Sequence, residues 1–209
     1  VVVIISNCKK FRKPFYEQLG DLLNKSNIQI EVYYSDSRPE IALRRDDYDL
    51  PPPLGKKVGR IYLWGGRILF QFVPLSAIIS ADLIIIIQAT GILLNYPLLI
   101  LSALRMKRVA FWGHGRNHQG SENSIGERVK RYLANTTDWW FSYTEETKSY
   151  LISIGVSANK ITAINNAIDT TGFRKSVQSV TTDELKSLRF RLGVEEGDPV
   201  ALYCGALYK

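Results

Sequence analysis

The chain has 209 residues, 45% of them hydrophobic, which is enough for one large α/β domain or for one domain and part of another. Its net charge of +7 favours anionic partners, namely nucleic acid, phosphorylated small molecules or an acidic membrane face. The two cysteines, Cys8 and Cys204, lie near opposite ends without metal-ligand spacing, which argues against a disulfide scaffold and favours a reducing compartment.

The sequence shows no secretory leader and no clean transmembrane segment. The most apolar region, residues 68–104, is interrupted by prolines and polar residues before it reaches about 20 apolar residues. We therefore predict a soluble, cytoplasmic protein, and peripheral contact with the inner face of a membrane stays open. Because the sequence does not begin with Met, we expect residues upstream of Val1.

The first 72 residues predict a strand, a helix, a strand, a polar loop rich in proline and a β-hairpin. In order, these lie at residues 1–6, 13–26, 28–34, 35–57 and 58–72. The first strand is wholly apolar, as in strands buried on both faces. Pro14 suits the first turn of the helix, and Gly65 with Gly66 suits the hairpin turn.

From residue 81 onward, strands and helices alternate. Beginning with a strand, we predict them at residues 81–88, 91–106, 107–113, 121–135, 138–144, 145–156 and 159–169. Capping boxes are expected at Ser124 with Glu127 and at Ser142 with Glu145. This order predicts a doubly wound, mostly parallel, Rossmann-like α/β sheet, in which ligands bind beyond the carboxyl ends of the strands.

The composition changes after Asp169. We predict a Rossmann-like domain over residues 1–170, a polar linker with one helix over residues 171–198, and an apolar strand over residues 199–209. Because a lone strand at the end of a chain has no partner to bury its faces, we expect this strand to begin a second domain that continues beyond Lys209.

Both histidines of the chain, His114 and His118, lie in "FWGHGRNHQG" after a predicted strand. Two histidines four positions apart can bind one zinc ion only if the segment is a helix. Gly113, Gly115 and Gly120 disfavour a helix, so we predict no metal site. Two interpretations stay open: a hydrogen-bonded loop histidine, or a functional loop. In the second, the backbone approaches a ligand closely and His114 donates to a hydroxyl or takes a proton.

Basic residues crowd the loop before the first predicted helix. Lys9, Lys10, Arg12 and Lys13 lie near the helix N-terminus, where anions are favoured. The loop has no glycine and is therefore no dinucleotide fingerprint. It is either a solvated basic turn or a binding site for a phosphate or a lipid headgroup.

The helix predicted at residues 91–106 is apolar with a basic end at Arg105, Lys107 and Arg108. This pattern describes either a buried crossover helix or a helix that lies on an anionic membrane. Elsewhere the charges are scattered and the aromatic residues lie in core-like strands, so we do not expect nucleic acid as a partner.

Four segments follow one another in a recognisable order. "VAFWGHG" is an apolar strand that ends in a histidine and a small residue, and "DWWFSYTEETKSYLISIG" runs from an aspartate through a hydroxyl residue to a helix that ends at glycine. "NKITAINNAIDTTGF" and "ALYCGALYK" follow. Together they resemble the amino-terminal half and the first strand of the second domain of a GT-B glycosyltransferase, specifically glycosyltransferase family 4. The first loop, "FRKPFYEQL", resembles some members more loosely.

The resemblance implies two Rossmann-like domains that face a cleft, the first binding mainly the acceptor and the second a nucleotide sugar, with no metal or other cofactor. His114 matches the family's cleft histidine, and Asn166 with Asp169 matches the inter-domain segment. With His114 as the catalytic residue, the expected substrate-binding residues are Lys10, Arg12, Lys13, Gly113, Gly115, Arg116, Asn117, Thr144 and Asn166.

The chain also departs from the family pattern. Ala167 and Ala206 stand where members commonly have glycine and a donor-binding arginine, and further donor-site residues would lie beyond Lys209. We therefore expect the usual donor site to be absent from this chain and the chain alone to be inactive.

We predict the acceptor-binding half of a retaining glycosyltransferase, which moves a sugar from a nucleotide sugar to a phosphorylated or lipid-linked saccharide in polysaccharide or lipopolysaccharide assembly. The expected partners are these two substrates, the second domain in cis and an anionic membrane surface. Two alternatives stay open. One is a non-catalytic half-enzyme that docks a membrane or a partner, and the other is a different Rossmann-like enzyme, such as an epimerase or a nucleotide-dependent ligase.

Overall fold

The computed structural model describes residues 1–38, 46–116, 125–166 and 168–203. Two compact units divide the chain, Val1–Ile168 and Asp169–Lys209. The expected capping box at Ser124 and the family departures at Ala167 and Ala206 lie outside the described residues.

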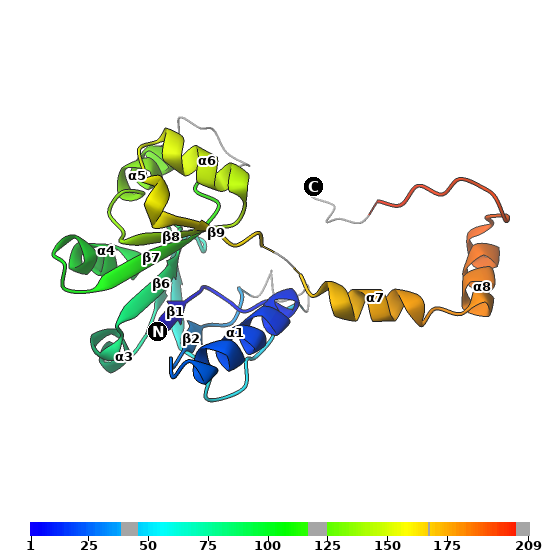
Figure 1. The fold of residues 1–209 in the computed structure, drawn as a ribbon, viewed down its shortest axis with the longest axis horizontal. Coiled ribbons are helices and arrows are strands. Elements are labelled where there is room, and N and C mark those ends of the chain that lie inside the picture. The colour runs from blue at the N-terminus through cyan, green and yellow to red at the C-terminus, as the bar shows by residue number, and fades with distance from the viewer. Residues whose placement is uncertain (39–45, 117–124, 167, 204–209) are drawn as a thin grey trace. The chain divides into compact units, whose positions relative to one another are not determined.

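The first unit is built on a seven-stranded sheet in which all paired strands run parallel, in the order β3-β2-β1-β6-β7-β8-β9 (Figure 1). The strands are β1 (Val2–Ile4), β2 (Glu31–Tyr34), β3 (Gly55–Lys57), β6 (Leu83–Ile87), β7 (Arg108–Gly113), β8 (Trp139–Ser142) and β9 (Ile161–Ala163). The order reverses between β1 and β6, so the carboxyl ends of these strands form the edge at which doubly wound sheets bind ligands. The predicted doubly wound α/β fold is confirmed.

Helices of the first unit pack on both faces of the sheet. They are α1 (Lys13–Lys25), α3 (Leu75–Ser80), α4 (Asn95–Ala103), α5 (Ile125–Leu133) and α6 (Glu145–Ser153), with short 3-10 turns η1 (Lys10–Arg12) and η2 (Ala158–Lys160). Pro14 lies in the first turn of α1, as predicted. The helices after the hairpin bury residues against one face of the sheet, whereas α1 packs Tyr16 against the other.

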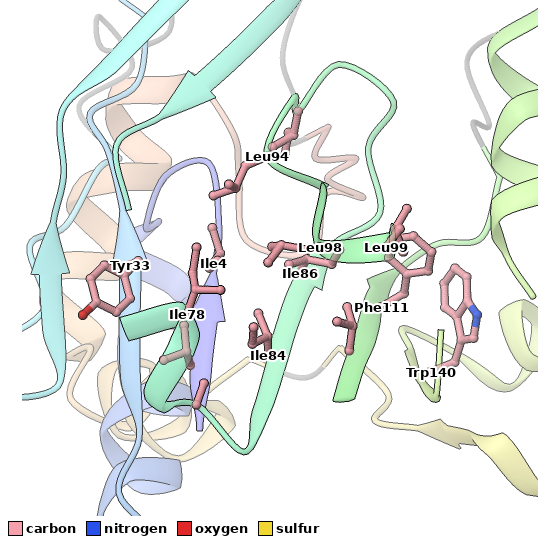
Figure 2. Close-up of a cluster of buried hydrophobic side chains, with 14 of the residues drawn as sticks. Ile4, Tyr33, Ile78, Ile84, Ile86, Leu94, Leu98, Leu99, Phe111 and Trp140 are labelled. Carbon is pink, nitrogen blue, oxygen red and sulfur yellow. The ribbon is translucent and has the colours of Figure 1, made fainter. Parts of the chain in front are cut away.

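Each face of the sheet carries its own core, because successive side chains of a strand point to opposite faces. Ile84, Ile86 and Phe111 pack with Leu98 and Trp140 on the face that α4 covers (Figure 2). The opposite core is smaller and forms around Tyr16 of α1, with Val3, Ile5, Val32 and Trp112 from the strands. Complete burial of one such aliphatic side chain stabilises the fold by about 1.5–3 kcal/mol.

A separate two-stranded antiparallel hairpin joins β3 to α3. Its strands are β4 (Arg60–Leu63) and β5 (Ile68–Gln71). Gly65 and Gly66 both have positive φ, 63° and 82°, at the turn, as the sequence predicted.

One strand and one α-helix of the first unit were not predicted. The segment expected to be a loop contains β3, whose three residues include two lysines and show no strand pattern. Gly55 is required in β3, because a Cβ there would lie 2.3 Å from the carbonyl oxygen of Leu50. The helix α3 has only six residues, too few for a helical period to stand out from the neighbouring apolar strands.

The second unit holds one helix more than predicted. Residues 171–198 were expected to hold one helix, but the structure has two, α7 (Thr170–Gln178) and α8 (Thr182–Leu192), which Asp169 and Thr181 cap. The expected strand over residues 199–209 is not present in its described part, residues 199–203, and the rest lies outside the described residues.

The N-cap of α6 also differs from prediction. Ser142 is buried within β8, and its hydroxyl donates to the carbonyl of Thr144. The capping residue is Thr144, whose Oγ1 accepts from the backbone N–H of Thr147 at 3.1 Å. Across the described ranges, no helix has the length and apolar character needed to cross a membrane.

Candidate functional site

Four loops at the carboxyl edge of the sheet bring together residues that are distant in sequence. They follow β1, β7, β8 and β9, and they carry Arg12, His114, Tyr143 and Asn166 respectively. Because the strands are parallel, these loops leave the sheet at the same edge.

Arg12 connects the first of these loops to the last. Its Nη2 donates to Oδ1 of Asn166 at 3.0 Å, although the two residues are 154 positions apart. Asn165 and Asn166 have positive φ, 53° and 21°, a region that Asn enters more readily than most residues. This turn after β9 makes the meeting with Arg12 possible.

The guanidinium of Arg12 also lies over aromatic rings. Its Cζ is 4.8 Å from the ring centroid of Trp112 and 5.0 Å from that of Tyr143. Cation–π contact with these buried rings favours this placement, and a guanidinium can also bind an oxyanion or a hydroxyl oxygen.

His114 follows the last residue of β7 and is exposed. Its ring lies edge-on to that of Tyr143, with 4.2 Å between centroids and 76° between planes. Tyr143 thus contacts both the imidazole of His114 and the guanidinium of Arg12. Burial raises the pKa of Tyr143, and the charge of Arg12 acts in the opposite direction, so the phenol stays protonated near neutral pH.

An aromatic cluster supports this arrangement from α1. Phe15 and Tyr16 lie 5.5 Å and 5.9 Å from the ring of Trp112, centroid to centroid, and Trp112 lies 6.1 Å from Tyr143. Trp112, Tyr143 and Tyr16 are buried, so Arg12 packs against a surface made mainly of aromatic rings.

The other basic residues of the first loop do not join this group. Lys9 donates from Nζ to Asp46 and Asp47, both at 2.7 Å, and is therefore a structural residue of the loop. The Nζ of Lys13 lies 4.8 Å from the ring centroid of Tyr48, and Lys10 is exposed. Of the basic residues expected to bind substrate in this loop, only Arg12 contacts the residues around Tyr143.

The remaining expected residues belong to the adjoining turns. Gly113 ends β7, and its carbonyl accepts from the backbone N–H of Tyr143 at 3.2 Å. Gly115 has a φ of +72° at a site where a Cβ would lie 3.1 Å from Tyr150. Arg116 forms an ion pair with Glu146 of α6 at 2.9 Å, and the hydroxyl of Thr144 caps the same helix. Asn117 and His118 lie outside the described residues.

Trp112 and Tyr143 were not predicted from the sequence as site residues. Both are the aromatic residues that come just before a predicted site residue at a strand end, Trp112 before Gly113 and Tyr143 before Thr144. That position was the available signal, but aromatic residues in apolar strands were interpreted as core. In the ranges that the structure describes, no three His, Cys, Asp or Glu side chains gather in a way that could hold a metal ion.

No protein-family model matches the chain, and no curated protein matches it. Among solved structures, the chain is similar to the UDP-GlcNAc 2-epimerase of Methanocaldococcus jannaschii, with 16% identity and a TM-score of 0.49 over 78% of this chain and 44% of that one. It is also similar to the UDP-GlcNAc 2-epimerase of Neisseria meningitidis bound to UDP-GlcNAc, with 14% identity and a TM-score of 0.48 over 92% and 54% of the two chains.

A third similar structure is HepE from Anabaena in complex with UDP and glucose, with 14% identity and a TM-score of 0.45 over 92% of this chain and 50% of that one. The chain thus spans about half the length of these proteins. At this level of similarity they assign no activity to it.

Proposed function

We propose that this chain is the acceptor-side lobe of a GT-B glycosyltransferase of family 4. The enzyme transfers a sugar from a nucleotide sugar to a phosphorylated or lipid-linked saccharide, with retention of configuration and without a metal or other cofactor. A second domain holds the nucleotide, and the setting is cell-surface polysaccharide or lipopolysaccharide assembly.

The observation that carries this proposal is the meeting of three segments that the family resemblance names separately. Arg12 of the first loop contacts Asn166 of the segment after β9, and both Arg12 and His114 contact Tyr143. Each motif is a local pattern, and local patterns alone give no reason for these particular side chains to contact one another.

The geometry suggests a role for each residue. Arg12, whose guanidinium lies over the rings of Trp112 and Tyr143, binds a phosphate or hydroxyl oxygen of the acceptor. His114 orients a hydroxyl of the sugar or of the acceptor. In the reaction, the acceptor oxygen forms a bond to the anomeric carbon on the face from which the nucleoside diphosphate leaves, and its proton passes to an oxygen of the departing phosphate. The nucleoside diphosphate leaves with the bonding electron pair of the broken bond.

The direct test uses the full-length protein encoded by the gene, nucleotide sugars labelled in the sugar, and a lipid extract as acceptor. We expect label in the acceptor together with an equal amount of free nucleoside diphosphate. Arg12→Ala should lower this transfer at least ~10²-fold, in line with the loss of a positioned charged group. Arg128→Ala, on an exposed part of α5, is the matched control and should leave the transfer rate unchanged.

Two outcomes contradict the proposal. One is conversion of the nucleotide sugar to its epimer with no label in the acceptor, which indicates an epimerase. The other is the absence of any nucleotide-sugar binding at millimolar concentration in isothermal titration, which indicates a docking subunit without catalysis.

A further inference from the structure

A basic hollow lies at the amino edge of the sheet, opposite the edge that carries His114. It has a volume of about 390 Å³ and lies between the end of α4, the start of β7 and the turn before β8. The residues on which its chemistry depends are Arg105, Lys107, Arg108, Thr137, Asp138 and Lys160. His114 follows the last residue of β7 and Arg108 is its first, so the two sites are separated by the length of that strand.

The charge of the hollow is unbalanced. Its one carboxylate, Asp138, already accepts hydrogen bonds through Oδ2 from the hydroxyl of Ser102 at 3.1 Å and the backbone N–H of Val109 at 2.9 Å. Lys107 donates to the backbone carbonyls of Ile79 and Ala81.

The side chains of Arg105, Arg108 and Lys160 form neither a hydrogen bond nor an ion pair with any residue that the structure describes. Three cations therefore share the hollow without a carboxylate of their own, which favours an anion there.

A buried hydroxyl provides a second, independent indication of a ligand. Thr137 lines the hollow and is 5% exposed, and its Oγ1 has no hydrogen-bond partner among the described residues. Buried polar groups almost always find a partner, so this hydroxyl favours an oxygen-bearing ligand beside it.

The hollow adjoins an apolar surface of two helices. Residues 93–104, which include α4, contain no charged residue, yet Ile100 and Leu104 are 60% and 63% exposed. Ile79, on the exposed side of α3, is 63% exposed. The hydrogen bond from Lys107 to the carbonyl of Ile79 brings the end of α3 beside the segment that follows α4. Cations therefore border an uncharged, exposed apolar face.

We propose that the hollow binds the phosphate of an anionic phospholipid and that the outer faces of α3 and α4 rest on the surrounding membrane surface. A phosphate fits the three unpaired cations and the hydroxyl of Thr137, and the acyl region of the same lipid fits the apolar face. This surface is independent of the proposed transfer reaction, because it uses neither the residues nor the edge of the sheet assigned to that reaction.

The test is sedimentation of the chain with vesicles of phosphatidylglycerol in phosphatidylcholine and with vesicles of phosphatidylcholine alone. We expect binding to the anionic vesicles, weakened by salt, and little binding to the neutral ones. The triple variant Arg105→Gln, Arg108→Gln, Lys160→Gln should lower the partition coefficient by about two orders of magnitude, given the usual effect of each basic residue at an anionic surface.

The matched control neutralises three basic residues of the second unit, Arg174→Gln, Lys175→Gln and Lys186→Gln. It removes the same net charge and should lower partitioning much less. Ile100→Ser with Leu104→Ser changes only exposed positions, so it should fold as the parent chain does and bind anionic vesicles more weakly. Circular dichroism checks the folding of every variant.

Equal loss in the two triple variants would mean that net charge alone drives binding, and this would overturn the proposal. So would unchanged partitioning of the Ile100→Ser, Leu104→Ser variant. A thermal shift with inorganic phosphate that the hollow variant abolishes, combined with no vesicle binding, would assign the hollow to a soluble phosphate compound and overturn the membrane assignment.

Discussion

The imidazole of His114 lies edge-on to the phenol ring of Tyr143, with 4.2 Å between the ring centroids. The guanidinium of Arg12 contacts the same phenol ring, with its Cζ 5.0 Å from the ring centroid. Tyr143 is buried at the end of β8 and therefore sets the positions of two groups that come from different loops.

Substitution of Tyr143 should separate its ring contacts from its hydroxyl. Tyr143→Leu removes the aromatic contacts with His114, Trp112 and Arg12, and we expect the free energy of unfolding to fall by about 1–3 kcal/mol. Tyr143→Phe keeps the ring and should lower the free energy of unfolding by less than about 1 kcal/mol. Urea unfolding measures both variants. Equal losses would mean that the hydroxyl, and not the ring, stabilises this region.

His114→Ala should leave folding intact and lower sugar transfer by the full-length enzyme ~10²-fold or more, because a positioned polar group commonly contributes that much. The matched substitution is His118→Ala, in the same sequence motif, which should have a smaller effect. Steady-state rates and far-UV circular dichroism check the pair. Unchanged turnover in His114→Ala would reduce this histidine to a structural loop residue.

Gly115 should tolerate a side chain poorly for two separate reasons. Its φ is +72°, and a Cβ would lie 3.1 Å from Tyr150 and 3.3 Å from Leu151. We expect Gly115→Ala to lower the free energy of unfolding by ~2–3 kcal/mol, from backbone strain and crowding together. Gly65→Ala is the control, because its φ is +63° but no described atom lies within 4 Å of the added Cβ. It should cost only the strain, ~1 kcal/mol, as measured by urea unfolding.

Cys8 should make the fold sensitive to alkaline pH. Burial raises the pKa of its thiol from 9.0 to about 12, so the native state keeps the proton that the unfolded state loses above about pH 9. The free energy of unfolding therefore keeps its full value with respect to Cys8 below pH 9. It falls as the pH rises from there toward about 12, because the unfolded state alone releases the thiol proton. Urea midpoints across this range should fall more steeply for the parent chain than for Cys8→Ala. Parallel curves would contradict the assignment.

Local patterns in the sequence were sufficient for most of the sheet and for the longer helices that cover it, whereas α3 was not predicted. Runs such as "VVVII" and "LIIII" are apolar on both faces, which suits the centre of a parallel sheet and little else in a soluble domain. Within α1, however, the apolar residues at helical spacing, Phe15, Leu19, Leu22 and Leu23, do not include the residue that is fully buried. Leu22 is exposed and the buried residue is Tyr16, because the aromatic ring of Trp112 on the sheet receives it.

For the candidate site, the sequence identified Arg12, His114 and Asn166 as residues of interest but could not say which of their neighbours would join them. Lys9 and Arg12 look alike in a list of basic residues. In the structure Lys9 forms ion pairs with Asp46 and Asp47. Arg12 instead lies over the rings of Trp112 and Tyr143 and donates a hydrogen bond to Asn166. This difference depends on partners tens of residues away.

The sequence by itself determined the alternation of strands and helices, the parallel sheet and the loops at the carboxyl ends of its strands. These follow from apolar periodicity and from the short-range preferences of proline, glycine and capping residues, all of which act within a few positions along the chain. Only the tertiary structure decided that Tyr143 holds His114 and Arg12 together, and that unpaired cations border an apolar face at the other edge. Such groupings arise when separate strands align in a sheet, because that alignment sets the distances between residues that are far apart in sequence.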